Sequence, residues 1–193
     1  MRSVTGTVGA AAWAILPAAM PFAYYDRLST RDKDIYRRSD RIGEVRLPHP
    51  RLLWPFVDGL KEALAREQRP AIHAAAQHLS NGIAEMLEIP RVEVEVLAVR
   101  PTSRYGELHG LYTSGDRAVP RIQVWMRTVR HKRVVAFRTF LRTLLHELGH
   151  HLDYTYLKLP DSFHTEGFFR RESSLFYQLV PRLPAPDRSV GPP

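Results

Sequence analysis

The sequence predicts an α+β fold with helices first, then a small, mainly antiparallel sheet, a long helix, a turn and a closing helix. Apolar residues recur at helical spacing over residues 57–64, 72–87 and 137–152, whereas residues 92–96 and 122–126 alternate between apolar and polar side chains. With 193 residues, 44% of them hydrophobic, the chain is long enough for one domain with a sizeable core.

Composition divides the chain into three parts. Residues 1–50 are expected to be an N-terminal extension, poorly ordered or peripheral; residues 51–180 form the single domain, and residues 181–193 a proline-rich tail. Residues 4–25 carry no charge, but the apolar run is short and broken by glycine and proline. We therefore expect no stable membrane span and a cytoplasmic location, with export through this apolar segment as the alternative.

Helices should dominate the first half of the chain. Ser29 or Thr30 can cap a short helix within the charged part of the extension. Residues 57–64 and 72–87 form two amphipathic helices, separated near Pro70.

The second half should alternate between strands and helices. Residues 92–96 and 122–126 are half-buried strands, and residues 108–112 are expected to form another. The basic segment 130–133 makes the turn into the long helix, and the closing helix is expected over residues 168–180.

The long helix carries the motif His146-Glu147-Leu148-Gly149-His150. Side chains at positions i and i+4 lie on one helix face, so His146 and His150 can share one metal ion. Glu147 can then act as a general base on a metal-bound water. Gly149 costs the helix about 1 kcal/mol relative to alanine, and we expect it to let a neighbouring segment approach the metal closely.

A third ligand must follow the motif, because catalytic zinc usually takes three protein ligands. The chain has no cysteine, so any metal is held by histidine and carboxylate. The candidates are His164, Glu166 and Glu172. We expect Asp153 to orient a ligand histidine from behind and His151 to be a surface residue.

The segment around the third candidate resembles a known family. His164 follows His150 by 14 residues and is itself followed four residues later by Phe168. Together with the helix motif, this pattern resembles the SprT-like zincin metallopeptidases over roughly residues 122–169. Two departures are visible: Thr165 stands where the family often has glycine, and the cysteine-bearing zinc ribbon of some members is absent.

The resemblance implies a zincin-like fold in which His146, His150 and His164 bind Zn2+ and Glu147 is the catalytic residue. A glutamate-ligand zincin is the competing assignment. Glu172 lies on the closing helix in a segment loosely similar to the ImmA/IrrE-type peptidases, and it would then replace His164.

These residues predict a zinc-dependent metallopeptidase that hydrolyses a protein or peptide substrate through a zinc-bound water activated by Glu147. Tyr112, Tyr154 and Tyr156 are candidate donors to the oxyanion. The strand 122–126 could pair with an extended substrate if it forms the edge of the sheet.

The alternative is a DNA- or protein-binding module with a zincin fold, and the SprT-like resemblance implies that such a module would act on DNA-associated proteins. The net charge of +8 and the isoelectric point near 10.1 favour acidic partners. Basic residues that could contact phosphates precede the motif: Arg127, Arg130, Lys132, Arg133, Arg138 and Arg142.

Overall fold

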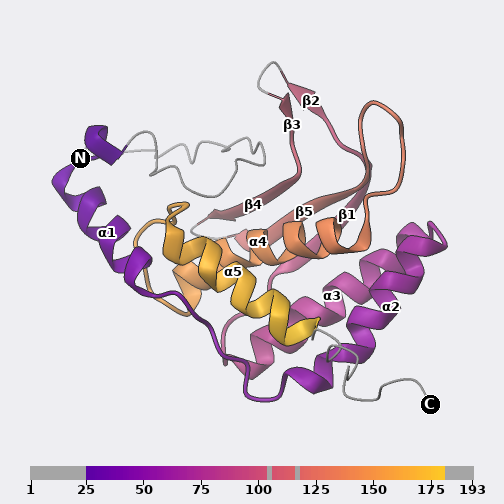
Figure 1. Cartoon of the computed structure of the whole chain (residues 1–193), viewed down its shortest axis with the longest axis horizontal. Coiled ribbons are helices and arrows are strands. Elements are labelled where there is room, and N and C mark those ends of the chain that lie inside the picture. Colours follow the sequence, from indigo (N-terminus) through magenta and orange to yellow (C-terminus); the bar gives the residue numbers. More distant parts are fainter. Residues whose placement is uncertain (1–24, 104–105, 116–117, 181–193) are drawn as a thin grey trace, which may run out of the picture.

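The computed structural model describes residues 25–103, 106–115 and 118–180, and within them it confirms the α+β class (Figure 1). The helices are α1 (Thr30–Arg41), α2 (Trp54–Ala65), α3 (Arg69–Met86), α4 (Phe137–Thr155) and α5 (Glu166–Leu179). The strands are β1 (Glu93–Val99), β2 (Thr102–Ser103), β3 (Gly106–Glu107), β4 (Gly110–Gly115) and β5 (Ala118–Arg127). Each predicted helix and strand has a counterpart at nearly the predicted position.

The main sheet is mixed, with the strand order β1-β5-β4. Strand β1 runs parallel to β5, with Val94 opposite Ile122, whereas β4 runs antiparallel to β5, with Tyr112 opposite the same residue. This arrangement corrects the prediction of a mainly antiparallel sheet. Strand β5 also lies in the middle, so the prediction that residues 122–126 could pair with a substrate is wrong. Period-2 alternation reports which face a strand buries but not which strands are its neighbours.

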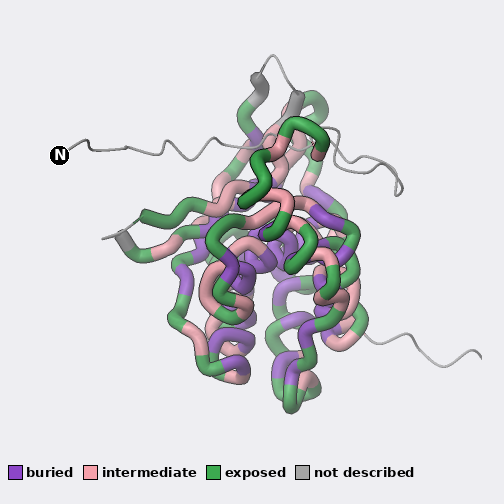
Figure 2. Tube along the Cα trace, turned by 90° about the vertical axis from the view of Figure 1, so that its left-hand side faces the viewer, coloured by how far each residue is buried: buried purple, intermediate pink, exposed green. Residues whose placement is uncertain are grey.

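The core lies between the sheet and the helices. Val94 of β1, together with Ile122 and Val124 of β5, points from one face of the sheet into a cluster that includes Leu141 and Leu145 of α4. Figure 2 shows the buried residues gathered where the helices meet the sheet, with exposed residues around them. The helix that carries the histidine motif therefore packs directly on the sheet.

The segment before residue 50 is part of this packed structure. Ser29 caps α1 by accepting a hydrogen bond from the Asp32 N–H at 3.1 Å, as its sequence position predicts. Val45 and Leu47 lie in the core, 2% and 5% exposed. The predicted boundary between extension and domain at residue 50 therefore falls inside the packed structure. The segment before residue 50 is mostly charged, so its composition does not indicate the few residues that are buried.

Two predicted regions, the apolar segment up to residue 24 and the tail 181–193, lie outside the described residues. Among the helices of the described part, none is long and apolar enough to cross a membrane.

Candidate metal centre

Three histidine side chains converge at one point beside the sheet. His146 and His150 project from neighbouring turns of α4, and His164 comes from the loop that precedes α5. The Nε2 atom of His164 lies 3.1 Å from the Nε2 atom of His146 and 3.1 Å from that of His150. One nitrogen from each ring lies within 4.8 Å of the other two. The motif helix and the third predicted histidine are thus brought together.

Hydrogen bonds on the far side of two rings determine which nitrogen carries the proton. His146 Nδ1 lies 3.2 Å from Glu172 Oε2, and a carboxylate can only accept. His150 Nδ1 lies 2.8 Å from Ser162 Oγ, whose own hydrogen is donated to Asp153 Oδ2 at 2.7 Å. Both Nδ1 atoms therefore donate, and both Nε2 atoms present a lone pair toward His164.

This donor set fits a metal ion. Two Nε2 lone pairs face the same nitrogen of His164, and one N–H hydrogen there could satisfy only one of them well. A tetrahedral ion with metal–nitrogen distances of about 2.0–2.1 Å separates its ligand nitrogens by about 3.3 Å, close to the spacing observed. The three histidines can therefore hold one metal ion, with a carboxylate or a hydroxyl behind two of them.

The Phe168 ring packs against all three histidines. Its centroid lies 4.8, 4.9 and 5.2 Å from those of His146, His150 and His164, respectively. A Cβ atom at Gly149 would lie 3.0 Å from Phe168 Cζ. The absence of a side chain at Gly149 therefore lets α5 approach α4 at the metal centre, as predicted.

Glu147 lies against the edge strand β4 and is 3% exposed. The backbone N–H of Tyr112 donates to its carboxylate, and a Cβ atom at Gly110 would collide with its Oε1 atom. Burial raises the pKa of Glu147 to about 8, and the hydrogen bond from Tyr112 opposes this shift. Gly110 is not among the predicted site residues; a glycine inside the predicted strand 108–112 was the available signal.

The two glutamate candidates for the third ligand lie elsewhere. Glu172 is behind His146 and forms an ion pair with Arg142 at 2.9 Å. Glu166 is exposed in the first turn of α5. Asp153 lies behind His150 as expected, but it acts through Ser162, which no sequence pattern indicated.

The prediction that His151 lies on the surface is wrong. Its side chain is 0% exposed, and its Nε2 atom donates to the Pro90 carbonyl at 2.8 Å. The Nδ1 atom therefore accepts from the Tyr112 hydroxyl at 3.1 Å. A position about 100° around the helix from His150 faces the sheet here, because β4 and the chain before β1 cover that side of α4.

The hydroxyls of Tyr112 and Tyr154 are bonded to residues other than the three histidines of the metal centre, and Tyr156 is exposed. The Tyr112 hydroxyl donates to His151, and the Tyr154 hydroxyl donates to Asp161 at 3.2 Å. Tyr156 is 42% exposed near the end of α4. None of these contacts supports the prediction that one of these hydroxyls stabilises an oxyanion.

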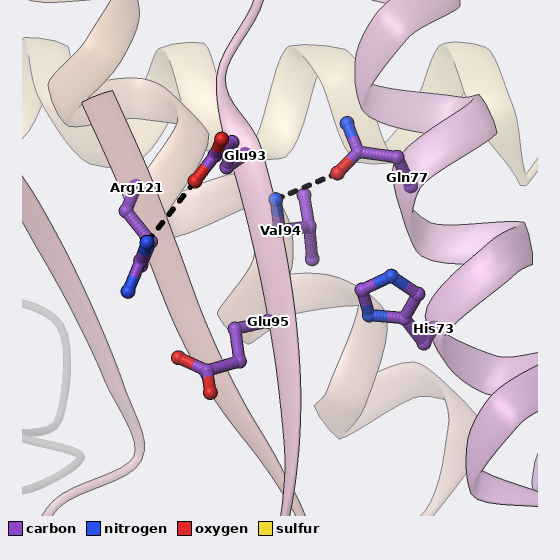
Figure 3. Close-up of a pocket in the computed structure, with 6 residues that line it drawn as sticks. All are labelled: His73, Gln77, Glu93, Val94, Glu95 and Arg121. Atoms are coloured by element: carbon purple, nitrogen blue, oxygen red, sulfur yellow. Dashed lines mark hydrogen bonds and ion pairs between the residues drawn. The ribbon is translucent and has the colours of Figure 1, made fainter. Parts of the chain in front are cut away.

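A separate pocket of about 320 Å³ lies between α3 and the other edge strand, β1 (Figure 3). The side-chain amide of Gln77 bonds to the main chain along the β1 edge of this pocket. Its Oε1 accepts from the Val94 N–H at 2.8 Å, and its Nε2 donates to the Val92 carbonyl at 3.0 Å. Glu93 pairs with Arg121 at 3.2 Å. These polar groups are largely paired with one another. Among the described residues, the group of side chains that could hold a metal ion is His146, His150 and His164.

Comparisons of the chain with models of protein families, with curated proteins and with solved structures found no match. The functional assignment therefore rests on the geometry of the site and on the sequence motif.

The buried histidines predict how the stability of the metal-free protein depends on pH. Burial lowers the pKa of His150 to about 3 and of His164 to about 4. Between pH 6.5 and 4 the unfolded chain therefore binds protons that the folded protein excludes, and these histidines lower the free energy of unfolding as pH falls. Each should contribute at most about 1.4 kcal/mol per pH unit.

Urea unfolding with chelator at pH 6.5, 5.5 and 4.5 measures this contribution. The double variant His150→Asn/His164→Asn should show a flatter dependence on pH than the wild type, because it lacks both groups. The comparison also removes the opposite effect of Glu147, which is present in both proteins. Equal pH dependence in the two proteins would contradict burial of these histidines in neutral form.

Proposed function

We propose that the chain is a zinc-dependent metallopeptidase of the SprT-like zincin type. The observation that carries the proposal is the convergence of three histidine nitrogens next to a buried glutamate, on the helix with the H-E-x-x-H motif. Three histidine ligands without cysteine are the donor set of a catalytic zinc ion, which keeps one coordination position for water or substrate.

Glu147 is the proposed general base. When bound, zinc would lower the pKa of a coordinated water toward about 7 and polarise the scissile carbonyl. Glu147 would accept the proton of the attacking water and pass it to the leaving amine. The Tyr112 N–H and the space left by Gly110 hold the Glu147 carboxylate against β4. The Glu147 carboxylate is thus positioned by a backbone N–H group and by the space at Gly110, and not by a charged side chain.

The two edges of the sheet suggest how a polypeptide substrate would bind. The edge of β1 is covered by side chains of α3, because Gln77 bonds to Val92 and Val94, and Arg69 donates to the Val96 carbonyl at 3.4 Å. Strand β4 is the other edge and lies beside Glu147. An extended peptide added along β4 would pass the three histidines, which supports peptide-bond hydrolysis as the reaction.

The test is metal-dependent cleavage by the full chain. Protein freed of metal with a chelator should bind one zinc ion per chain and should hydrolyse an unfolded polypeptide only after zinc is added. Mass spectrometry of the products detects new amino termini. Zinc binding without cleavage of any member of a diverse peptide library would contradict the peptidase and leave only a metal-binding protein.

The nucleic-acid alternative has weaker support. Of the basic residues before the motif, Arg127 pairs with Glu67, and Arg142 pairs with Glu172 while its guanidinium lies 4.2 Å from the Phe176 ring centroid. The exposed segment 130–133 is the part most accessible to phosphates. DNA binding that weakens steeply with salt would support this second function.

A further inference from the structure

A buried ion pair lies directly behind the metal centre. Arg171 of α5 donates to Asp153 Oδ1 of α4 at 2.8 Å, and the two side chains are 3% and 0% exposed. Removing one partner of such a pair leaves a buried charge without compensation, so loss of either side chain is expected to destabilise this region. Most buried polar and charged side chains of the described residues lie in or near this region.

The same guanidinium holds the end of α1. Arg171 Nη1 donates to the carbonyls of Ser39 at 2.7 Å and Ile42 at 2.5 Å. Its Nη2 atom donates to Ser39 Oγ at 3.0 Å. Helix C-terminal carbonyls lack partners within their own helix. Arg171 supplies such partners and thereby joins residues 39–42 to α5.

The other oxygen of Asp153 continues the connection to the metal centre. Asp153 Oδ2 accepts from Ser162 Oγ at 2.7 Å, and Ser162 Oγ in turn accepts from His150 Nδ1 at 2.8 Å. An unbroken series of hydrogen bonds therefore runs from the end of α1 to a histidine of the metal centre. We call Arg171, Asp153 and Ser162 the relay.

We infer that docking of residues 39–42 and metal binding by His150 are energetically coupled through the relay, with Arg171 as a positioning residue. The inference rests on metal binding by the proposed centre and not on peptidase activity. Arg171 aligns Asp153, Asp153 aligns Ser162, and Ser162 fixes the ring orientation and tautomer of His150. Coupling is reciprocal: if the docked segment strengthens metal binding, the metal must strengthen docking by the same factor.

The chain offers a matched control for this coupling. Gln178 also joins α5 to the segment after α1: its Oε1 accepts from the Leu47 N–H at 2.9 Å, and its Nε2 donates to the Val45 carbonyl at 2.8 Å. These bonds tether the neighbouring residues 45–47 without contacting Asp153 or Ser162. Gln178→Ala should therefore loosen the segment at residues 45–47 while leaving the relay intact.

Zinc affinity of the full chain, measured by competition with a chelating indicator, tests the inference from the metal side. Arg171→Met should weaken zinc binding about 10-fold, the lower range for loss of a group behind a ligand. Gly167→Ala should weaken it too, because the added Cβ would collide with the backbone carbonyls of Ser39 and Asp40 while Arg171 and Asp153 remain. Gln178→Ala should stay near wild-type affinity. Wild-type affinity in folded Arg171→Met or Gly167→Ala would overturn the coupling.

Hydrogen exchange tests the same coupling from the other side. Zinc should slow amide exchange in residues 30–42 of the wild type, and this protection should be reduced in Arg171→Met and retained in Gln178→Ala. Equal zinc-induced protection in Arg171→Met and the wild type, or none in the wild type, would refute the inference. A wild type that binds no zinc would instead refute the metal centre itself.

Discussion

Replacing Glu147 with glutamine is expected to reduce peptide hydrolysis at least about 10²- to 10⁴-fold, the usual contribution of a positioned general base, while zinc remains at about one ion per chain. Glutamine keeps an oxygen that can accept from the Tyr112 N–H and is small enough for the space beside Gly110. It cannot accept a proton from the attacking water. Glu147→Gln should therefore still bind zinc but should no longer hydrolyse peptides efficiently.

Zinc content and cleavage rate, measured on the same preparation, check this result. Glu166→Gln is the matched control, because Glu166 is an exposed carboxylate in the first turn of α5 and contacts no residue of the metal centre among the described hydrogen bonds. The control should cleave at the wild-type rate. Substantial hydrolysis by Glu147→Gln would require another base.

Replacing His164 with alanine is expected to weaken zinc binding more than about 100-fold, because loss of groups behind a ligand already costs about 10- to 100-fold. Its Nε2 atom lies 3.1 Å from the corresponding atoms of His146 and His150, so it completes the donor set. Zinc affinities of the purified variants provide the measurement.

The glutamate candidates supply the comparison for this variant. Glu172→Ala should have an intermediate effect, since Glu172 accepts from His146 Nδ1 rather than facing the three Nε2 atoms. Glu166→Ala should bind zinc like the wild type. If Glu172→Ala lost more affinity than His164→Ala, the glutamate-ligand assignment would be favoured instead.

The predictable parts of the site were those set by local geometry. The pairing of His146 with His150 follows from the helical repeat alone. Predicting that His164 joins them required a resemblance between motifs, because a chain segment that follows a helix can place its end in many positions. The order of the strands was not predictable, since alternation in β1 and β5 is the same for parallel and antiparallel neighbours.

Apart from Asp153, the supporting residues could not be predicted, because their roles depend on contacts between distant parts of the chain. Ser39 and Arg171 are 132 positions apart, and neither belongs to a recognisable motif. The surface prediction for His151 is wrong because the helical repeat does not reveal that β4 covers this face of α4. Burial of polar side chains is a property of tertiary packing, and composition alone gives little indication of it.

The covering of β1 by Gln77 and Arg69 also affects how copies of this protein meet one another. An uncovered edge strand is a template onto which another chain can add, and that is a common route to aggregation. Here amide and guanidinium groups from α3 bond to the main chain of alternate residues along that edge, Val92, Val94 and Val96. Self-association by strand addition is thereby disfavoured on this side of the molecule.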